Sequence, residues 1–259
     1  MRYYPVFLNL QRRLCVVIGG GRVAERKVKT LLRAGARVKV ISPRLTAPLA
    51  RLKDQKRISH LPRTYRSSDL REAFLAIGAT DDRFINERIF REAASGRIPV
   101  NVVDDPAHST FIVPSIVKKK DLLVAISTSG KSPALARLLR QKLEKEIGRE
   151  YEVLLNLLGR VREKLLPLGR GQSRNQQVFR RLVGEDLLAL IRGKKFRELD
   201  RRLSKVLGPG YSLQELGLKG GKRQRARSGE HRAESRALTA RNPASGRKIE
   251  FGARRFQEC

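Results

Sequence analysis

The chain has 259 residues, 40% of them hydrophobic, which suffices for one or two domains with a sizeable core. Its formal net charge of +32 favours anionic partners such as nucleic acid, acidic lipid or a polycarboxylate substrate. No apolar run approaches the ~20 residues that cross a bilayer, and the N-terminus lacks a secretory pattern, so we expect a cytoplasmic protein without a membrane span. The two cysteines and three scattered histidines have no metal-ligand spacing, so no metal site is predicted.

The first half of the chain alternates short apolar runs with segments of helical periodicity. Strands are expected over residues 4–10, 14–18, 37–41, 58–65, 74–80 and 98–103. Helices are expected from the glycine turn at 19–21 to Gly35, over 69–74 and over 83–94. Strands that alternate with helices predict a parallel sheet covered on both faces, which is an α/β fold of the Rossmann type.

The sequence GGGRVA at residues 19–24 fits the pattern G-x-G-x-x-G/A between a strand and a helix. Gly19 permits the tight turn, Gly21 lets the backbone approach a pyrophosphate, and Ala24 lets the helix pack close to the strand. The free N–H groups at the helix start would face the phosphates. The predicted dinucleotide-binding residues are Gly19, Gly20, Gly21, Arg22, Val23 and Ala24. A glycine-rich turn without a ligand is the alternative.

The end of the second strand lacks the carboxylate that usually holds the ribose hydroxyls of a bound dinucleotide. Ser42, Pro43 and Arg44 occupy that place. Arg44 either meets a 2′-phosphate, which would favour NADP, or stacks on adenine, or lies in solvent. The sequence therefore leaves the choice between NAD and NADP open.

The pattern changes after Pro106. Apolar runs at 110–117 and 122–127, separated by the polar residues 118–121, predict a β-hairpin. An amphipathic helix follows over 133–147, with Ser132 as its N-cap and Pro133 at its first position. We interpret the leucine stripe of this helix as core or dimer contact.

Helical patterns continue over 149–168 and 175–206, and residues 211–218 predict one last short helix. From residue 219 the chain is basic and has no apolar period, which predicts a disordered tail. A nucleic-acid-binding arm is the alternative for this tail.

Asp104 is the strongest catalytic candidate. It ends an apolar strand at the carboxyl edge of the sheet, where ligands bind in open α/β folds, and a carboxylate placed there can act as a general base. Alternation along the strand would turn Asp105 the other way. His108 lies in the same loop and either assists proton transfer, iron capture or substrate binding, or is simply exposed. As an alternative to catalysis, Asp104 caps the turn before Pro106.

Two further polar segments precede predicted helices. Asp81 and Asp82 stand before the helix over 83–94, and we interpret them as helix caps. Ser127, Thr128 and Ser129 form a hydroxyl-rich loop before the helix over 133–147. Such a loop binds anions readily, so it is a candidate site for a substrate carboxylate.

Five segments in this order resemble the siroheme synthase family, in its precorrin-2 dehydrogenase and sirohydrochlorin ferrochelatase part. They are GGGRVAERK (19–27), GATDD (78–82), NVVDDP (101–106), FIVPSI (111–116) and AISTSGKSPALARLLRQKLE (125–144). The resemblance covers residues 1–150 closely and 150–215 in architecture only. The chain is too short for the methyltransferase domain of the fused enzymes, so it resembles the stand-alone version.

The resemblance implies a function and its site residues. The family oxidises precorrin-2 to sirohydrochlorin with NAD, and some members then insert ferrous iron. The family's essential aspartate aligns with Asp104, and Ala79 and Thr80 fall beside the cofactor. Thr128 aligns with a serine that is phosphorylated in some members, which puts that regulation in doubt here. The family's fold implies a homodimer with a swapped dimerisation region and a substrate cleft between domains.

We therefore expect four parts in this chain. They are an NAD-binding Rossmann-type domain (1–113), a dimerisation region (114–148), a small helical domain (149–218) and a basic disordered tail (219–259). Two other functions compete with the dehydrogenase. One is a nucleotide-sensing regulator whose basic helical module binds DNA, although no helix-turn-helix signal is visible. The other is a nucleotide-gated subunit of an ion transporter, which usually keeps the acidic residue after the second strand.

Overall fold

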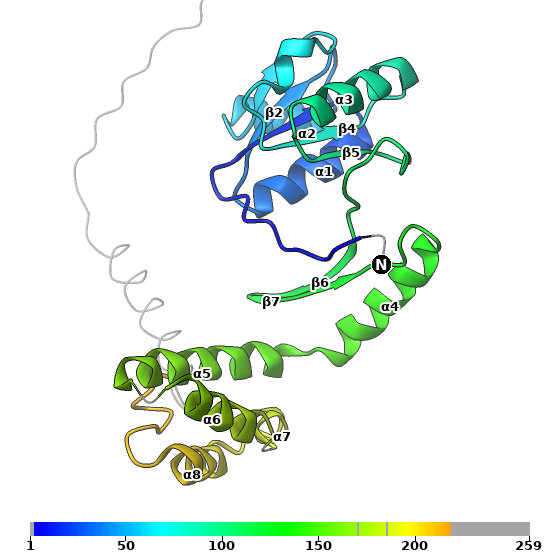
Figure 1. The fold of residues 1–259 in the computed structure, drawn as a ribbon. Helices are drawn as coiled ribbons and strands as arrows, with labels where there is room; N and C mark the ends of the chain where they lie inside the picture. The colour runs from blue at the N-terminus through cyan, green and yellow to red at the C-terminus, as the bar shows by residue number, and fades with distance from the viewer. Residues whose placement is uncertain (1–2, 170, 185, 219–259) are drawn as a thin grey trace, which may run out of the picture. The chain divides into compact units, whose positions relative to one another are not determined.

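The computed structural model describes residues 3–169, 171–184 and 186–218. It divides into two compact units, Met1–Ile147 and Gly148–Cys259, which are described one at a time. The basic tail predicted from residue 219 lies outside the described residues (Figure 1). Within the described ranges, no helix is long and apolar enough to cross a membrane.

A five-stranded parallel sheet forms the centre of the first unit. Its strands are β1 (Leu14–Ile18), β2 (Arg37–Ile41), β3 (Ser59–Leu61), β4 (Leu75–Gly78) and β5 (Val100–Val102). Their spatial order is β3-β2-β1-β4-β5, and every neighbouring pair is parallel. From β1 the strand order runs one way to β2 and β3, and the other way to β4 and β5. The loops after β1 and β4 therefore lead to opposite faces of the sheet. Such a reversal creates the crevice in which α/β proteins bind ligands. The predicted α/β fold class is confirmed.

Helices cover both faces of this sheet (Figure 1). They are α1 (Arg22–Arg33), α2 (Ala47–Asp54), α3 (Arg83–Ser95) and the 3₁₀ turn η1 (Ser67–Leu70). Cys15 and Val17 of β1 pack in one buried cluster with residues of α1 and α2, whereas Val16 and Ile18 pack in another with residues of α3. Because successive side chains of a strand point to opposite faces, a strand covered on both faces is apolar throughout. This explains why β1 has no alternating pattern.

The rest of the first unit is a hairpin and a helix. The strands β6 (Ser115–Lys119) and β7 (Leu122–Ile126) pair antiparallel, and α4 (Pro133–Glu146) follows. The Ser132 hydroxyl accepts a hydrogen bond from the Leu135 N–H at 3.2 Å, so the predicted N-cap is confirmed. Leu135, Leu138 and Leu139 are 38–47% exposed, so much of the leucine stripe of α4 is uncovered in a single chain.

The second unit is helical. It contains α5 (Arg149–Leu165), η2 (Leu166–Leu168), α6 (Gln172–Gly184), α7 (Leu187–Arg192) and α8 (Phe196–Leu207). Its core is a single cluster that includes the fully buried Leu157, Val161, Leu182, Leu199 and Leu203. These side chains come from α5, α6 and α8 at helical spacing, as expected for amphipathic helices that share one core.

Two predicted elements are wrong. Residues 4–10 form no strand, and Tyr4 and Phe7 are 81% and 72% exposed. An apolar run becomes a strand only where a sheet edge accepts it, and this run pairs with none. Residues 211–218 form turns rather than a helix, because the Asp200 carboxylate of α8 accepts the Leu213 N–H at 2.7 Å and fixes a local bend.

Other elements differ from the prediction in extent, and one was missed. The helix α2 was not predicted, although Thr46 before it and Pro48 in its first turn are start signals. The helical pattern over 175–206 is interrupted, with Gly193 ending α7 and Lys194 at a φ of +54°. The first hairpin strand begins at Ser115 instead of residue 110.

Candidate functional site

The glycine turn after β1 is packed too tightly for any side chain at its first two positions. Gly19 has a φ of +119°, and a Cβ there would lie 2.1 Å from the carbonyl oxygen of Ala79. A Cβ on Gly20 would lie 1.9 Å from the carbonyl oxygen of Arg44. Only glycine fits such contacts without moving the backbone. The turn is therefore held between the segments that follow β2 and β4, and the structure brings these predicted site residues together.

The third glycine faces open space at the start of α1. Gly21 is the N-cap of α1, no side chain caps the helix, and a Cβ on Gly21 would have no heavy atom within 4 Å. The first N–H groups of a helix lack acceptors within it, and the helix dipole adds positive charge there. Open space before such groups fits a pyrophosphate. Ala24 is fully buried, as its packing role requires, whereas Arg22 and Val23 lie on the exposed side of the first turn.

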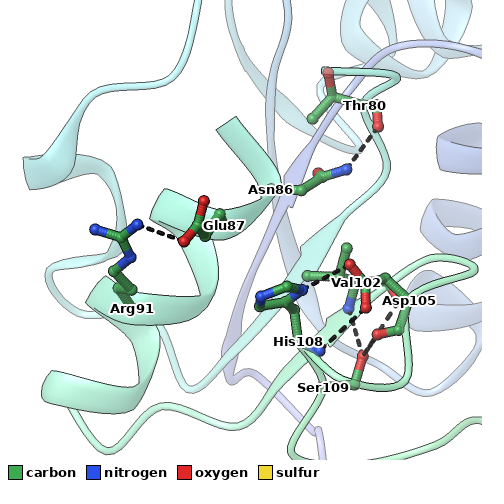
Figure 2. Close-up of polar contacts among 8 residues, drawn as sticks. All are labelled: Thr80, Asn86, Glu87, Arg91, Val102, Asp105, His108 and Ser109. Atoms are coloured by element: carbon green, nitrogen blue, oxygen red, sulfur yellow. Dashed lines mark hydrogen bonds and ion pairs between the residues drawn. The ribbon is translucent and has the colours of Figure 1, made fainter. Parts of the chain in front are cut away.

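The segment after β4 is organised by its own side chains. The Thr80 hydroxyl accepts the Asp82 N–H at 3.1 Å, and the Asn86 amide of α3 donates to the Thr80 carbonyl at 3.0 Å (Figure 2). Asp82 caps α3 by accepting two backbone N–H groups, which confirms its predicted role, and Asp81 is exposed. Ala79 is partly buried against Gly19.

Asn86 is a residue that the sequence did not single out. Its side-chain oxygen is buried, and no described residue donates a hydrogen bond to it. A buried oxygen without a donor is uncommon in native proteins, so it marks this end of β4 as a polar position. The only sequence signal was the position of Asn86 in the first turn of a helix that follows a strand at the sheet edge.

Asp104 lies in a turn rather than at the end of a strand. The strand β5 ends at Val102, and the Asp105 N–H bonds to the Val102 carbonyl at 3.2 Å, which closes a turn with Asp104 at a φ of +60°. The expectation that strand alternation separates Asp104 from Asp105 is therefore wrong. The two carboxylates differ in their hydrogen bonds instead. The exposed Asp104 has no hydrogen bond or ion pair to any described residue, whereas Asp105 bonds to His108.

The surroundings of Asp104 include a lysine of α1. Burial lowers the pKa of Lys27, the neighbouring Arg26 lowers it further, and the Asp104 carboxylate opposes both by favouring the charged ammonium. Val103, next to Asp104, packs against the cluster that contains Ala24 and other residues of α1. The Asp104 turn is thus an electrostatic neighbour of the helix that begins at the glycine turn.

His108 is held by Asp105 (Figure 2). The Asp105 carboxylate lies 2.7 Å from Nδ1 of the imidazole and also accepts the His108 backbone N–H at 3.2 Å. These bonds, led by that to the imidazole, lower the pKa of Asp105. The Phe90 ring packs edge-on against the imidazole at 5.2 Å between centroids. Because a carboxylate only accepts, it fixes the proton on Nδ1 and leaves Nε2 as the free ring nitrogen.

The edge strand β5 is closed by side chains that come from downstream in the chain. The hydroxyl of Ser109 accepts the Val102 N–H at 2.9 Å, and that of Thr110 accepts the Val100 N–H at 2.8 Å. These bonds take the place of a further strand and end the sheet. They also fold the segment that carries Asp104 and His108 back over the edge of β5.

The hydroxyl loop before α4 uses part of its bonding capacity internally. The Thr128 hydroxyl accepts the Ser132 N–H at 3.1 Å and donates to the Ser132 carbonyl at 3.0 Å. The Ser127 hydroxyl accepts the Ser129 N–H at 3.0 Å, and Ser129 has a φ of +53°. Thr128 is therefore committed to holding the loop, while the Ser129 hydroxyl has no hydrogen bond to the described residues.

Metal-binding geometry is not found in the described part of the chain, where no three His, Cys, Asp or Glu side chains gather. Cys15 is buried within β1, and burial raises the pKa of its thiol to about 11. It is a small apolar residue of the core rather than a nucleophile.

Comparison with known proteins follows the same division. Residues 6–115 match a family model described as putative NAD(P)-binding, and residues 120–146 match one described as sirohaem biosynthesis protein central. Among solved structures, one titled "SirC, precorrin-2 dehydrogenase" superposes with a TM-score of 0.63 at 22% identity, covering 79% of this chain and 98% of that one. This likeness supports the fold.

Curated relatives are named siroheme synthase. The protein of Methylobacillus flagellatus is 43% identical over 193 residues, which are 73% of this chain and 41% of the relative. That of Neisseria meningitidis serogroup C is 36% identical over 211 residues, 82% of this chain and 44% of the relative. That of Nitrosomonas europaea is 45% identical over 166 residues, 64% of this chain and 35% of the relative. The chain thus spans less than half the length of these relatives.

Proposed function

We propose that this chain, a homologue of the siroheme synthases, oxidises precorrin-2 to sirohydrochlorin with NAD as the hydride acceptor. The observation that carries the proposal is the free carboxylate of Asp104 on the same sheet edge as the dinucleotide turn. The strand β4 lies between β1 and β5, and strands are spaced about 4.8 Å apart, so the two sites are separated by about 10 Å along that edge.

The packing of the glycine turn supports a dinucleotide at this place. The N–H groups at the start of α1 would hold the pyrophosphate, and the segments after β2 and β4 would flank it. When bound, the nicotinamide ring supplies the acceptor for a hydride. The four-part division of the chain with boundaries at 113, 148 and 218 stays part of this proposal.

Asp104 is proposed as the base. Oxidation of a carbon–carbon single bond to a double bond removes a hydride from one carbon and a proton from its neighbour. Bound nicotinamide would supply the hydride acceptor, and the Asp104 carboxylate would take the proton. That carboxylate is exposed and has no hydrogen bond to a described side chain, so it is available to a substrate proton.

The substrate is a tetrapyrrole with a ring of carboxylates, which suits a strongly basic chain. We propose the hydroxyls of Ser127 and Ser129 as donors to these carboxylates, and His108 as a third contact in its imidazolium form, in which Nε2 carries a proton to donate. Thr128 contributes by holding the loop in shape. This part of the proposal is supported by the Asp105 carboxylate, which holds the imidazole in place, and by the internal bonds of the loop.

Three finer points belong to the same proposal. A homodimer is supported by the exposed leucines of α4, because apolar side chains that share one helix face are usually covered by a partner. Insertion of ferrous iron as a second substrate is supported by the siroheme synthase relatives. A cytoplasmic location is the third. The DNA-binding regulator gains no support from the relatives, and the transporter subunit is favoured by no observation.

Product formation tests the proposal. The purified chain is incubated anaerobically with precorrin-2 and NAD, and both the absorbance spectrum and the amount of NADH are followed. We expect the spectrum of the more conjugated sirohydrochlorin, with one NADH formed per tetrapyrrole. A reaction without NAD is the control. An unchanged spectrum with a folded protein that binds NADH would exclude the dehydrogenase.

A further inference from the structure

The segment after β2, residues 42–46, has side chains suited to binding an anion rather than to accepting hydrogen bonds from a sugar hydroxyl. It contains no Asp or Glu, and its one ionisable residue is Arg44. A dinucleotide without a 2′-phosphate is normally held here by a carboxylate that accepts from the ribose hydroxyls, whereas an arginine accommodates the 2′-phosphate of NADP. The composition of the segment thus matches the second ligand chemistry.

The backbone of this segment is fixed against the glycine turn. The Thr46 N–H donates to the Gly20 carbonyl at 3.0 Å, and the Ser42 hydroxyl donates to the Arg44 carbonyl at 2.7 Å. Nε2 of His60 on β3 lies 2.8 Å from the Ser42 carbonyl oxygen and holds the start of the segment. The Arg44 carbonyl packs so close to Gly20 that no side chain fits between them. The Arg44 side chain therefore starts beside the pyrophosphate cradle, on the β2 side where the adenosine lies in this fold.

Among the described residues, the carboxylate that contacts this segment is that of Glu25, and it is already engaged. Glu25 of α1 accepts the Thr46 hydroxyl at 2.9 Å and pairs with Lys29 of its own helix. These two bonds, with that to Lys29 the larger, lower the pKa of Glu25. The Glu25 side chain is only 17% exposed, so it is tied into the surface rather than free for a ribose.

The two arginines beside the glycine turn, in contrast, form no ion pair with a described residue: they are Arg44, which is exposed, and Arg22 at the start of α1. A guanidinium forms bidentate, charge-assisted hydrogen bonds with a phosphate. We infer that Arg44 binds the 2′-phosphate of NADP, so that this chain accepts NADP in addition to NAD. The inference rests on the proposed dinucleotide site at the glycine turn.

The test uses fragments that differ only in the 2′-phosphate. Calorimetry on the full chain compares adenosine 2′,5′-bisphosphate with 5′-AMP. We expect the bisphosphate to bind at least roughly ten times more tightly, as a charge-assisted hydrogen bond allows. Arg44→Ala should remove this preference while leaving the affinity for 5′-AMP within about twofold, and Arg44→Glu should reverse it.

A matched control is available on the same strand. Arg37 is an exposed arginine at the opposite end of β2, away from the carboxyl edge, so Arg37→Ala should leave the preference intact. Equal binding of the two fragments by the wild-type chain would overturn the inference, as would no binding of either, or a preference that survives Arg44→Ala. Unfolding midpoints confirm that the Arg44 variants fold.

The outcomes separate this inference from the proposed function. A chain that oxidises precorrin-2 with NAD but shows no preference for the bisphosphate refutes the role of Arg44 and leaves the dehydrogenase intact. A chain that prefers the bisphosphate through Arg44 but does not oxidise precorrin-2 supports the 2′-phosphate site and refutes the tetrapyrrole reaction.

Discussion

Replacement of Gly21 by aspartate should have opposite effects on stability and on cofactor binding. Gly21 is the N-cap of α1 with φ −82° and ψ −173°, an extended conformation that any residue adopts, and a Cβ there meets nothing within 4 Å. Aspartate is among the best N-cap residues, and a negative charge at this end is favoured by the helix dipole. Gly21→Asp should therefore keep or raise the unfolding midpoint.

Dinucleotide affinity should fall, because the new carboxylate stands where we propose that the pyrophosphate binds. At a separation of about 5 Å and an effective dielectric constant of ~40, each of two phosphate charges is repelled by about 1.7 kcal/mol. The sum of about 3 kcal/mol corresponds to a roughly 100-fold loss of affinity. The aspartate also takes for itself N–H groups that the phosphates would use.

Calorimetric titration of NADH, with thermal unfolding in parallel, measures both effects. Gly21→Asn is the matched control, since asparagine has the same size and capping ability without the charge. We expect Gly21→Asn to lose less affinity than Gly21→Asp. Unchanged NADH affinity in Gly21→Asp would refute the assignment of the turn, and equal losses in both variants would refute the electrostatic reasoning.

Three further predictions concern the rest of the described chain. Asp69 accepts two bonds from Arg63, at 2.7 and 2.8 Å, and this pairing lowers its pKa, so Asp69→Asn should cost about 1 kcal/mol near pH 7. That cost should vanish as the pH falls below about 4 and the wild-type carboxyl protonates, and a constant difference in urea unfolding would contradict this. Light scattering should give twice the 29.3 kDa chain mass for the wild type and a smaller mass for Leu138→Lys; a wild-type monomer would exclude the dimer. His108→Gln should raise KM for precorrin-2 several-fold with NADH affinity unchanged, and an unchanged KM would remove His108 from the substrate site.

Local sequence patterns predicted the strands and helix around the glycine turn well. The bounds of β1 and β2 agree with the prediction, because buried parallel strands next to a glycine turn are marked by their own residues. The structure explains the need for glycine at positions 19 and 20 more specifically than the motif does. A Cβ at Gly19 would clash with Ala79 and one at Gly20 with Arg44, and both partners lie far along the chain and meet the turn only in the folded sheet.

The end of β5 shows where local reasoning failed. The chain leaves β5 at Val102 in a turn closed by the Asp105 N–H, and the free edge of the strand is covered because hydroxyls of Ser109 and Thr110 take up its N–H groups. Those hydroxyl bonds come from residues seven to ten positions downstream, and no periodicity within the strand encodes them. Strand alternation consequently gave a wrong reason for the difference between Asp104 and Asp105. Likewise, the pairing of Asp105 with His108 depends on a turn that forms only when the chain folds back.

The most direct test of the account is the initial rate of sirohydrochlorin formation by Asp104→Asn and Asp105→Asn, with NADH binding measured for both. Asparagine tolerates the left-handed conformation of Asp104, so the first variant should keep the turn. If Asp104 takes the substrate proton, Asp104→Asn should slow oxidation by roughly 10²–10⁴-fold with unchanged NADH affinity, and Asp105→Asn should slow it much less. Near-normal oxidation by Asp104→Asn would contradict the account.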